Sequence, residues 1–368
     1  MTLYIGLMSG TSLDGVDGVL ADPSSSAASL AHLHRPFDAA LRAELLALNT
    51  PGGADELHRA ALAANGVARA YAGLVHALLA AAGVPAPAVR AIGAHGQTVR
   101  HRPGLLEGHG YTLQLLNGAL LAELAGIDVV CDLRARDVAA GGQGAPLVPA
   151  FHAARFGLAG AATAVLNVGG IANLTLLGAD GSVRGFDCGP GNALMDLWAQ
   201  RHLGQAFDAD GAWAAGAAPD SALLTRLLAD PYFALAPPKS TGRDLFHACW
   251  LEAALRATPG LPPQTVQATL LELTAVAAAE ALRRHSPATT RLAVCGGGAR
   301  NRALMRRLAS RLPGVAVTAT DTLGVPPDQV EALAFAWLAR AFVEGHAGNL
   351  PSVTGAAGPR RLGALYPA

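Results

Sequence analysis

The chain has 368 residues, enough for two domains of ordinary size, and it is 51% hydrophobic and 15% charged. Lysine plus arginine equals aspartate plus glutamate, at 27 each, so no global charge favours nucleic acid or an anionic membrane. No signal peptide or continuous apolar span is expected, and the four cysteines form no Cys-x-x-Cys pair. The composition therefore predicts a cytoplasmic protein with reduced, buried cysteines.

A turn rich in small and polar residues opens the chain, between strands expected at 3–8 and 16–21. Glycine permits backbone angles that a side chain forbids, so amide and hydroxyl donors can converge there on phosphate oxygens. The residues expected to bind phosphate are Gly10, Thr11, Ser12, Leu13, Asp14, Gly15, Val16 and Asp17. The carboxylates of Asp14 and Asp17 suit a hydrated Mg²⁺ beside the phosphate. The alternative is a tight hairpin with polar turn residues.

Strands and helices alternate over the rest of the first half. Helical spacing of apolar residues predicts a long helix at 55–82, which Gly83-Val84-Pro85 ends because proline cannot continue it. The other expected elements are strands at 30–36, 89–94, 111–116 and 127–131, and helices at 42–48, 117–125 and 147–156. Polar residues follow two strand ends, at 95–98 and 132–137, where α/β proteins hold their ligands. Residues 100–109 are expected to form a solvated loop, and 141–146 a hinge.

The opening pattern returns in the second half. Strands at 162–168 and 171–177 join at Gly169-Gly170, and a third strand at 183–187 enters a Gly-Pro-Gly turn. The remaining elements are helices at 193–203, 221–229, 263–284, 302–310 and 327–342, strands at 292–295 and 315–317, and an apolar segment at 362–366. That last segment is expected to bring the chain back to the first domain.

Neither the P-loop pattern nor the dinucleotide fingerprint occurs, so a bound nucleotide would have to be held by hairpin turns. Two halves that each begin with a glycine-turned hairpin resemble the sugar kinase and actin-like superfamily. Eight motifs in order resemble the anhydro-N-acetylmuramic acid kinases. They lie at 6–17, 95–98, 132–137, 141–147, 167–173, 187–192, 239–243 and 295–301, and the similarity continues to 350–356. Leu133 and Cys188 depart from the family's frequent Phe and Thr.

The resemblance implies an α/β fold with two ribonuclease-H-like domains and an interdomain cleft. The domains are expected at 1–130 with the tail 351–368, and at 131–350. The implied reaction uses ATP and water to open 1,6-anhydro-N-acetylmuramic acid and phosphorylate O6, giving N-acetylmuramic acid 6-phosphate and ADP in peptidoglycan recycling. ATP and Mg²⁺ are the expected cofactors and this sugar is the small-molecule partner. A homodimer with no nucleic-acid or membrane partner is the expected state.

Two carboxylates carry the implied catalysis. The resemblance assigns the base that activates water to Asp187, and it puts Glu331 near the sugar as an assistant. Local sequence leaves alternatives open, a helix N-cap for Asp187 and a first-turn helix carboxylate for Glu331. Arg134 could pair with the lactyl carboxylate of the sugar through a bidentate contact, or with Asp137 in a salt bridge.

The remaining implied site residues contact the sugar or the nucleotide. The expected sugar contacts are His95, Gln97, Thr98, Arg134, Asp187 and Glu331. The expected nucleotide contacts beyond the first turn are Asn167, Gly169, Gly170, Asn173, Gly296, Gly297, Gly298 and Ala299. A satisfied loop histidine is the alternative for His95, and close packing is the alternative for the glycines at 296–298. Asn301 either caps the following helix or contacts the ligand.

Two other functions are compatible with these features. A hexose or amino-sugar kinase of the same superfamily would use Asp187 to deprotonate a sugar hydroxyl. A nucleotide-gated interaction protein would bind ATP without phosphorylating a small molecule. Isotopic oxygen from water at C1 would separate the first alternative from the anhydro-sugar reaction, and sugar-dependent ATP turnover would separate the second.

Overall fold

The chain divides into two compact units, and each is described by itself. The computed structural model describes residues 2–10, 13–25, 29–104, 110–242 and 245–368. Unit 1 comprises Met1–Phe151 and Gln329–Ala368, and unit 2 comprises His152–Asp328. These bounds differ from the expected 1–130 with 351–368 and 131–350, because the helix after residue 329 packs on the sheet of unit 1. The division also falls at 151–152, beyond the loop 141–146 that we expected to be the hinge.

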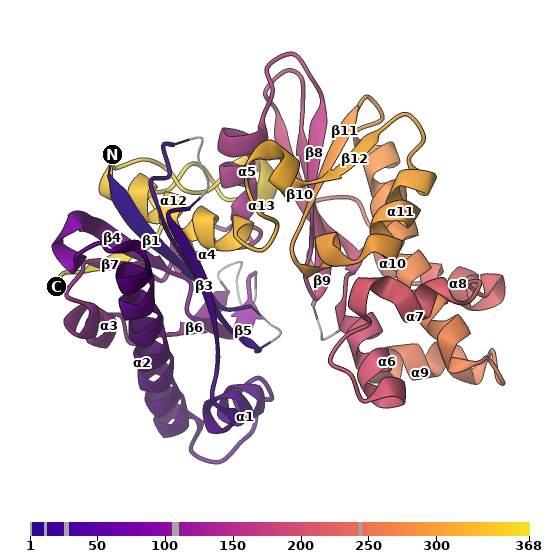
Figure 1. Cartoon of the computed structure of the whole chain (residues 1–368), viewed down its shortest axis with the longest axis horizontal. Coiled ribbons are helices and arrows are strands. Elements are labelled where there is room, and N and C mark those ends of the chain that lie inside the picture. Colours follow the sequence, from indigo (N-terminus) through magenta and orange to yellow (C-terminus); the bar gives the residue numbers. More distant parts are fainter. Residues whose placement is uncertain (1, 11–12, 26–28, 105–109, 243–244) are drawn as a thin grey trace. The chain divides into compact units, whose positions relative to one another are not determined.

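Each unit contains a mixed sheet with helices packed against it (Figure 1). The strands of unit 1 are β1 (Leu3–Met8), β2 (Gly15–Ala21), β3 (Ala31–Pro36), β4 (Val89–Ala94), β5 (Gln97–Arg102), β6 (Tyr111–Leu115), β7 (Val129–Cys131) and β13 (Ala364–Tyr366). Its helices are α1 (Ala39–Leu48), α2 (Glu56–Ala82), α3 (Gly118–Ala125), α4 (Ala135–Ala139), α12 (Val330–Val343) and α13 (Pro351–Thr354). Helix α5 (Val148–Phe156) spans the boundary between the units.

Unit 2 is built in the same way. Its strands are β8 (Thr163–Val168), β9 (Ile171–Leu177), β10 (Val183–Pro190), β11 (Arg291–Cys295) and β12 (Ala316–Ala319). Its helices are α6 (Ala193–Leu203), α7 (Ala212–Ala215), α8 (Ser221–Leu228), α9 (Ala248–Arg256), α10 (Pro263–His285) and α11 (Arg302–Arg311).

The two main sheets share one topology. The sheet of unit 1 has the order β13-β7-β4-β1-β2-β3, and the sheet of unit 2 has the order β10-β9-β8-β11-β12. In both, the first three strands are antiparallel neighbours, and the next two strands lie parallel to the first. The α/β fold and the ribonuclease-H-like order that the resemblance implied are confirmed. The repeat between the halves is therefore a repeat of topology.

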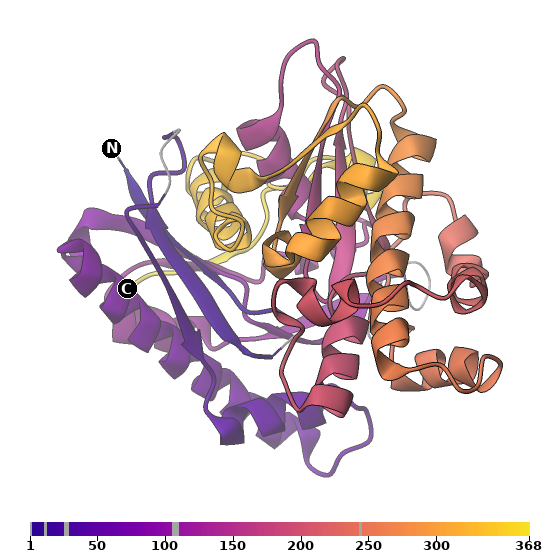
Figure 2. The same cartoon turned by 45° about the vertical axis from the view of Figure 1, so that its right-hand side comes forward.

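Helices cover both faces of the sheet in unit 1 (Figure 2). Gly6 of β1 lies opposite Gly93 of β4. A Cβ at Gly6 would lie 1.8 Å from the Ala332 carbonyl oxygen, and one at Gly93 would lie 2.0 Å from that of Phe335. The backbone of α12 therefore rests directly on this glycine pair. Neighbouring positions in β1, Ile5 and Leu7, face the other way, because side chains alternate along a strand, and they join the core under α2.

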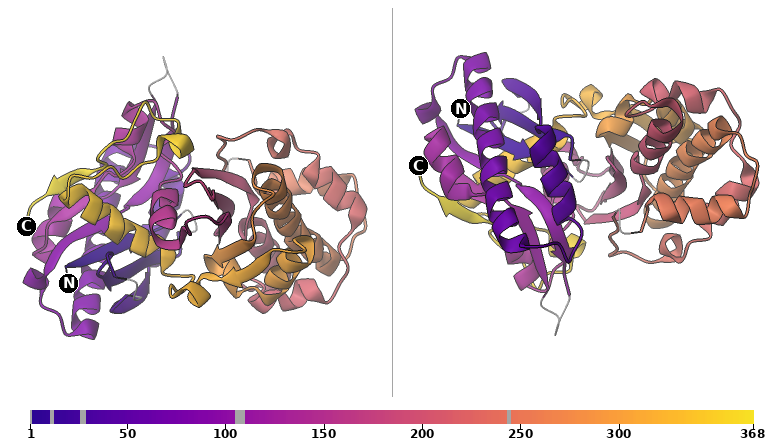
Figure 3. Two further views of the ribbon diagram at one scale, coloured as in Figure 1. Left: turned by 90° about the horizontal axis from the view of Figure 1, so that it is seen from above. Right: turned by 90° about the horizontal axis from the view of Figure 1, so that it is seen from below.

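The C-terminal tail returns to unit 1 as expected. β13 pairs antiparallel with β7 as an edge strand of the sheet, near the end marked C (Figure 3). Leu362, two residues before β13, is 2% exposed. In the same unit, Asp137 is fully buried and accepts hydrogen bonds from the side chains of Asn349 and Thr354, each at 2.7 Å. The C-terminal segment is thus held by both a strand pair and a buried carboxylate.

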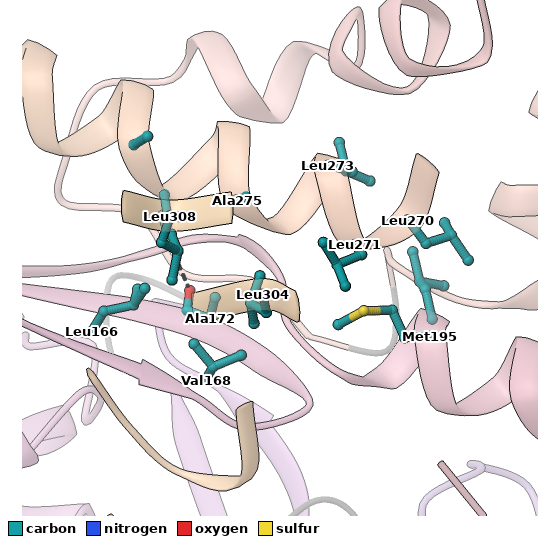
Figure 4. Packing of buried hydrophobic residues seen from close by; sticks show 14 of the residues in the cluster. Leu166, Val168, Ala172, Met195, Leu270, Leu271, Leu273, Ala275, Leu304 and Leu308 are labelled. Atoms are coloured by element: carbon teal, nitrogen blue, oxygen red, sulfur yellow. Dashed lines mark hydrogen bonds between the residues drawn. The ribbon is translucent and has the colours of Figure 1, made fainter. Parts of the chain in front are cut away.

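The hydrophobic core of unit 2 lies between one face of its sheet and helices α6, α10 and α11. Alternate residues of β8 and β9 pack there against leucines of α10 and α11 (Figure 4). Among the described helices, α10 is the one with the length and mean hydropathy, 1.2, of a membrane span. However, 83% of that stretch is buried inside the protein, as in the core helix of a globular domain.

Three expectations about local structure were wrong. Residues 100–102, expected to begin a solvated loop, belong to β5, which pairs with β6; the mostly polar sequence of β5 gives no apolar alternation that would predict a strand. β10 continues past Asp187 to Pro190 because β9 supplies a partner strand, with a bulge between Asp187 and Gly189. Cys249 is exposed, whereas Cys131, Cys188 and Cys295 are buried.

The contact between α12 and the glycine pair gives a test of the fold. Gly93→Ala forces a methyl group into the helix backbone, and such overpacking typically costs about 1–3 kcal/mol or more. We expect unit 1 to unfold at a distinctly lower denaturant concentration in this variant. The control is Gly53→Ala, where the nearest atom to a new Cβ is the flexible end of Arg59 at 3.1 Å. Equal midpoints for the two variants would contradict the packing described.

Candidate active site

The turn between β1 and β2 is held from inside unit 1. The Gly10 carbonyl oxygen accepts hydrogen bonds from the Leu13 amide at 3.3 Å and from Nε2 of Gln97 at 3.0 Å. Leu13 adopts a φ of 57° and buries its side chain in the core, so only its backbone is available to a ligand. The expected phosphate ligands Thr11 and Ser12 lie outside the described residues. Gly15 and Val16 are buried at the start of β2, with Asp14 exposed just before them.

Ser9, just before the turn, has a hydroxyl that is hydrogen-bonded within unit 1. Its side chain is buried, its Oγ donates to the Gly96 carbonyl oxygen at 2.9 Å, and it lies 2.7 Å from the hydroxyl of Tyr71. Tyr71 comes from the middle of α2 and is fully buried, and burial raises the pKa of its hydroxyl. The hydroxyl of Ser9 therefore fastens the end of β1 to α2 and to the end of β4.

His95 has a partner on each ring nitrogen. Nδ1 lies 3.0 Å from the Ser9 carbonyl oxygen, which can only accept, so Nδ1 carries the proton. Nε2 lies 3.0 Å from Nε of Arg134, which can only donate, so Nε2 is bare. Both contacts require the same neutral tautomer. Burial, and then the charge of Arg134, lower the pKa of His95 to about 3, which keeps the ring neutral near pH 7.

Arg134 and Asp137 bind the loop that follows them. Arg134 donates from Nη1 to the Gly144 carbonyl oxygen at 2.8 Å, and the Gly144 amide donates to Asp137 at 2.7 Å. Asp137 also accepts from Asn349 and Thr354, as described above. The pairing of Arg134 with Asp137 was the alternative from sequence, and these contacts give each residue other partners.

The two carboxylates expected to bind Mg²⁺ differ in their surroundings. Asp14 is exposed, whereas Oδ1 of Asp17 lies 3.1 Å from Nδ1 of His34 and 3.6 Å from Nε2 of His32. In the described part of the chain, no three His, Cys, Asp or Glu side chains are grouped to hold a metal ion. Mg²⁺ typically takes one or two carboxylates together with phosphate oxygens and water, so a protein cage is not required.

Thr98 and Glu331 are further expected sugar contacts in unit 1. Thr98 accepts a hydrogen bond from Gln114 at 3.1 Å across the β5–β6 pair. Glu331 is in the first turn of α12, one turn before Phe335, whose ring centre is 5.0 Å from that of His95. Residues four apart share one side of a helix, so Glu331 projects from the side of α12 that contacts His95.

A row of polar residues crosses the sheet of unit 2. Asp187 of β10 lies opposite Asn173 of β9, which lies opposite Asn167 of β8, which lies opposite Cys295 of β11. Residues directly opposite each other on paired strands lie on the same face of the sheet. The residues before and after Asp187, Asn173 and Asn167 fill the core of unit 2, so the row itself lies on the face of the sheet away from that core. Within the described residues, Oδ1 of Asn167 is buried without a hydrogen-bond partner.

Asp187 is clamped by the segment 232–241. Its carboxylate accepts from the Thr241 amide at 2.9 Å, and its carbonyl oxygen accepts from the Tyr232 hydroxyl at 2.7 Å. Nζ of Lys239 lies 4.6 Å from the centre of the Tyr232 ring and donates to the Tyr232 carbonyl oxygen at 3.1 Å. Helix α6 starts at Ala193 with Asn192 as its N-cap residue, so Asp187 is not a helix cap.

Glycine turns meet at the end of the same sheet. The carbonyl oxygens of Gly169 and Gly170 accept hydrogen bonds from the amides of residues 191–193 at the start of α6.

The turn after β11 lies close to Asn167. Gly296 has a φ of 74°, and a Cβ there would lie 2.4 Å from Oδ1 of Asn167. Gly297 and Ala299 belong to the short 3-10 turn Gly297–Arg300, and a Cβ at Gly298 would lie 2.4 Å from Val168. Asn301 caps α11 by accepting the Leu304 amide at 2.9 Å.

The structure groups the expected residues into two sets. The turn 10–17, His95, Gln97, Thr98, Arg134 and Glu331 belong to unit 1, and Asn167, Asn173, Asp187 and the glycine turns belong to unit 2. Sequence reasoning missed Tyr71 and Tyr232, whose hydroxyls contact Ser9 and Asp187. Neither tyrosine lies in a polar motif, and each is at least 45 residues from its partner, so local sequence carried no signal for them.

Comparison with known proteins covers the whole chain. Residues 2–368 match the family described as anhydro-N-acetylmuramic acid kinase. The anhydro-N-acetylmuramic acid kinase of Variovorax paradoxus (strain S110) is 61% identical over 372 residues, covering 100% of this chain and 99% of the relative. That of Cupriavidus pinatubonensis is also 61% identical, covering 99% of this chain and 98% of the relative.

Solved structures match more weakly. An activator of 2-hydroxyisocaproyl-CoA dehydratase from Clostridium difficile aligns over 94% of this chain and 96% of its own, at 12% identity and a TM-score of 0.48. Because that score is low, the assignment rests on the sequence relatives and on the topology of the two sheets. With full-length relatives at 61% identity and a family match from residue 2 to residue 368, the chain belongs to the anhydro-N-acetylmuramic acid kinase family.

Proposed function

We propose that this protein uses ATP and water to convert 1,6-anhydro-N-acetylmuramic acid into N-acetylmuramic acid 6-phosphate and ADP. Water attacks C1 and gives up a proton, the C1–O6 bond breaks, and O6 takes the γ-phosphate. The reaction needs a carboxylate base beside bound phosphate. The observation that carries the proposal is the polar row in unit 2, in which the Asp187 carboxylate shares a sheet face with Asn173 and Asn167 beside the glycine turns.

Asp187 is the proposed base. A general base must be held in position while it accepts the proton, and the backbone of Asp187 is fixed on both sides by Tyr232 and Lys239. Glu331 is proposed to assist at the sugar, and Arg134 to bind its lactyl carboxylate.

Nucleotide contacts are proposed for the turns of each unit by itself. In unit 1 they are the turn 10–17, and in unit 2 they are Asn167, Asn173 and the glycines at 169–170 and 296–298. Within the described residues, the unpartnered Oδ1 of Asn167 fits this role, because a carboxamide oxygen can accept a hydrogen bond from a hydroxyl or amino group of a ligand. Mg²⁺ would neutralise charge on the transferred phosphate. Cytoplasmic location and a homodimer remain part of the proposal through the family resemblance.

Isotopic labelling tests the reaction. In H₂¹⁸O, the product should carry one ¹⁸O at C1, because water forms the new C1 hydroxyl. A hexose or amino-sugar kinase would transfer phosphate to a hydroxyl of its substrate without adding water to C1. Mass analysis of the product, with ATP turnover measured with and without the anhydro sugar, distinguishes these reactions. A phosphorylated product without ¹⁸O at C1, or a rate of ATP turnover that is the same with and without the anhydro sugar, would refute the proposal.

Replacement of the base should separate catalysis from folding. Asp187→Asn can still accept the Thr241 amide but cannot take up a proton. A positioned base contributes about 10²–10⁴-fold, so kcat should fall at least about a hundredfold while both substrates still bind. Asp220→Asn is the control, because Asp220 is a helix cap in the same unit and accepts the Leu223 amide at 2.7 Å. A destabilised but active Asp187→Asn protein would show that Asp187 is structural.

The Mg²⁺ ligands can be examined through metal dependence. Asp14→Asn removes an exposed carboxylate, so the Mg²⁺ concentration for half-maximal rate should rise while the melting temperature stays the same. Glu123→Gln removes an exposed carboxylate of α3 and should leave both quantities unchanged. Rates are measured over a Mg²⁺ titration at saturating ATP and sugar. An unchanged titration curve for Asp14→Asn would remove Asp14 from the set of proposed ligands.

A further inference from the structure

Resting on the function proposed above, we infer that His95 is a positioning residue that joins the phosphate turn to Arg134, and not a ligand of the sugar. The sequence predicted a sugar contact, because His95 follows a buried strand. In the structure its side chain is 5% exposed and both ring nitrogens are occupied within unit 1. A ring with no free nitrogen has nothing left to offer a hydroxyl group.

His95 contacts one residue beside the turn 10–17, which is proposed to bind phosphate, and one residue proposed to bind the sugar, Arg134. On one side, Nδ1–H donates to the carbonyl oxygen of Ser9, the residue that precedes Gly10 at the start of the turn. On the other side, Nε2 accepts from Nε of Arg134, whose Nη1 donates to the Gly144 carbonyl oxygen. The imidazole therefore fixes the backbone that would hold phosphate and the side chain that would hold the lactyl carboxylate.

The surroundings of His95 hold this arrangement in place. The ring of Phe335 lies 5.0 Å away on α12, and α12 itself rests on the Gly6–Gly93 pair beneath. Gln97 anchors the next carbonyl oxygen, that of Gly10, at 3.0 Å. The low pKa of His95 keeps the accepting nitrogen bare over the pH range in which the enzyme would work. One neutral tautomer of His95 therefore makes both contacts that join the turn to Arg134.

Two substitutions separate the two contacts. The side-chain nitrogen of Asn is as many bonds from Cα as Nδ1 of His, so His95→Asn keeps the donor to Ser9 and loses the acceptor for Arg134. The carbonyl oxygen of Gln is as many bonds away as Nε2, so His95→Gln keeps the acceptor for Arg134 and loses the donor to Ser9. A histidine that was only a packing residue would give the same defect in both variants.

We expect opposite defects in the two variants. His95→Asn should raise the KM of the anhydro sugar about tenfold, the scale of a lost hydrogen bond to a charged group, with the KM of ATP within about twofold of wild type. His95→Gln should raise the KM of ATP and leave that of the sugar nearly unchanged. Calorimetric binding of a non-hydrolysable ATP analogue provides the same comparison without turnover. His76→Asn and His76→Gln are matched controls on the exposed side of α2.

A double-substitution cycle tests whether the sugar effect passes through Arg134. If it does, His95→Asn should add little to the sugar KM of Arg134→Lys, because groups in contact are not additive. Equal changes of both KM values in both His95 variants, or fully additive effects with Arg134→Lys, would overturn the inference. Wild-type protein without anhydro-sugar kinase activity would instead refute the proposed function, so the two failures are distinguishable.

Discussion

The contact between a helix backbone and a pair of glycines organises unit 1. Gly6 and Gly93 lie side by side on neighbouring strands, and the carbonyl groups of α12 occupy the space that their side chains would take. This contact joins the last 40 residues of the chain to its first strand. It also sets the height of α12 above the sheet, and so sets where Phe335 meets His95 and where Glu331 projects.

The two faces of each sheet carry different kinds of side chain, and strand geometry is the reason. Side chains alternate along a strand, so one face of each sheet can be apolar while the other carries chemistry. In unit 1, Ile5 and Leu7 join the core under α2, and Gly93 and His95 follow the α12 side. In unit 2, Leu166 and Leu174 join the core, while Asn167 and Asn173 lie on the opposite face with Asp187. In each unit, the polar residues named here therefore lie on the sheet face opposite the apolar core that the neighbouring strand positions fill.

Several residues of the family motifs stabilise the site from within. Ser9, His95, Gln97 and Asp137 all hold backbone groups, and each has little exposed surface. Buried polar groups need partners, because an unpaired one loses its hydrogen bonds to water without replacement. The turns that these residues hold are those proposed to bind phosphate and sugar, so the motif residues act as supports for backbone that must not move.

The sequence by itself determined most of the strand and helix order, the repeat of glycine-turned hairpins, the return of the tail to unit 1 and the family. These are set by local signals, namely apolar periodicity, glycine and proline positions, and motif spacing. Only the tertiary structure decided the contacts between residues that are far apart in the sequence. The strand β5 exists because β6 supplies its partner, Ser9 and His95 turn inward because Tyr71 and Arg134 meet them, and Tyr232 reaches Asp187 across 45 residues. Such contacts depend on side chains that become neighbours only when the sheet and its helices have assembled, so no local pattern records them.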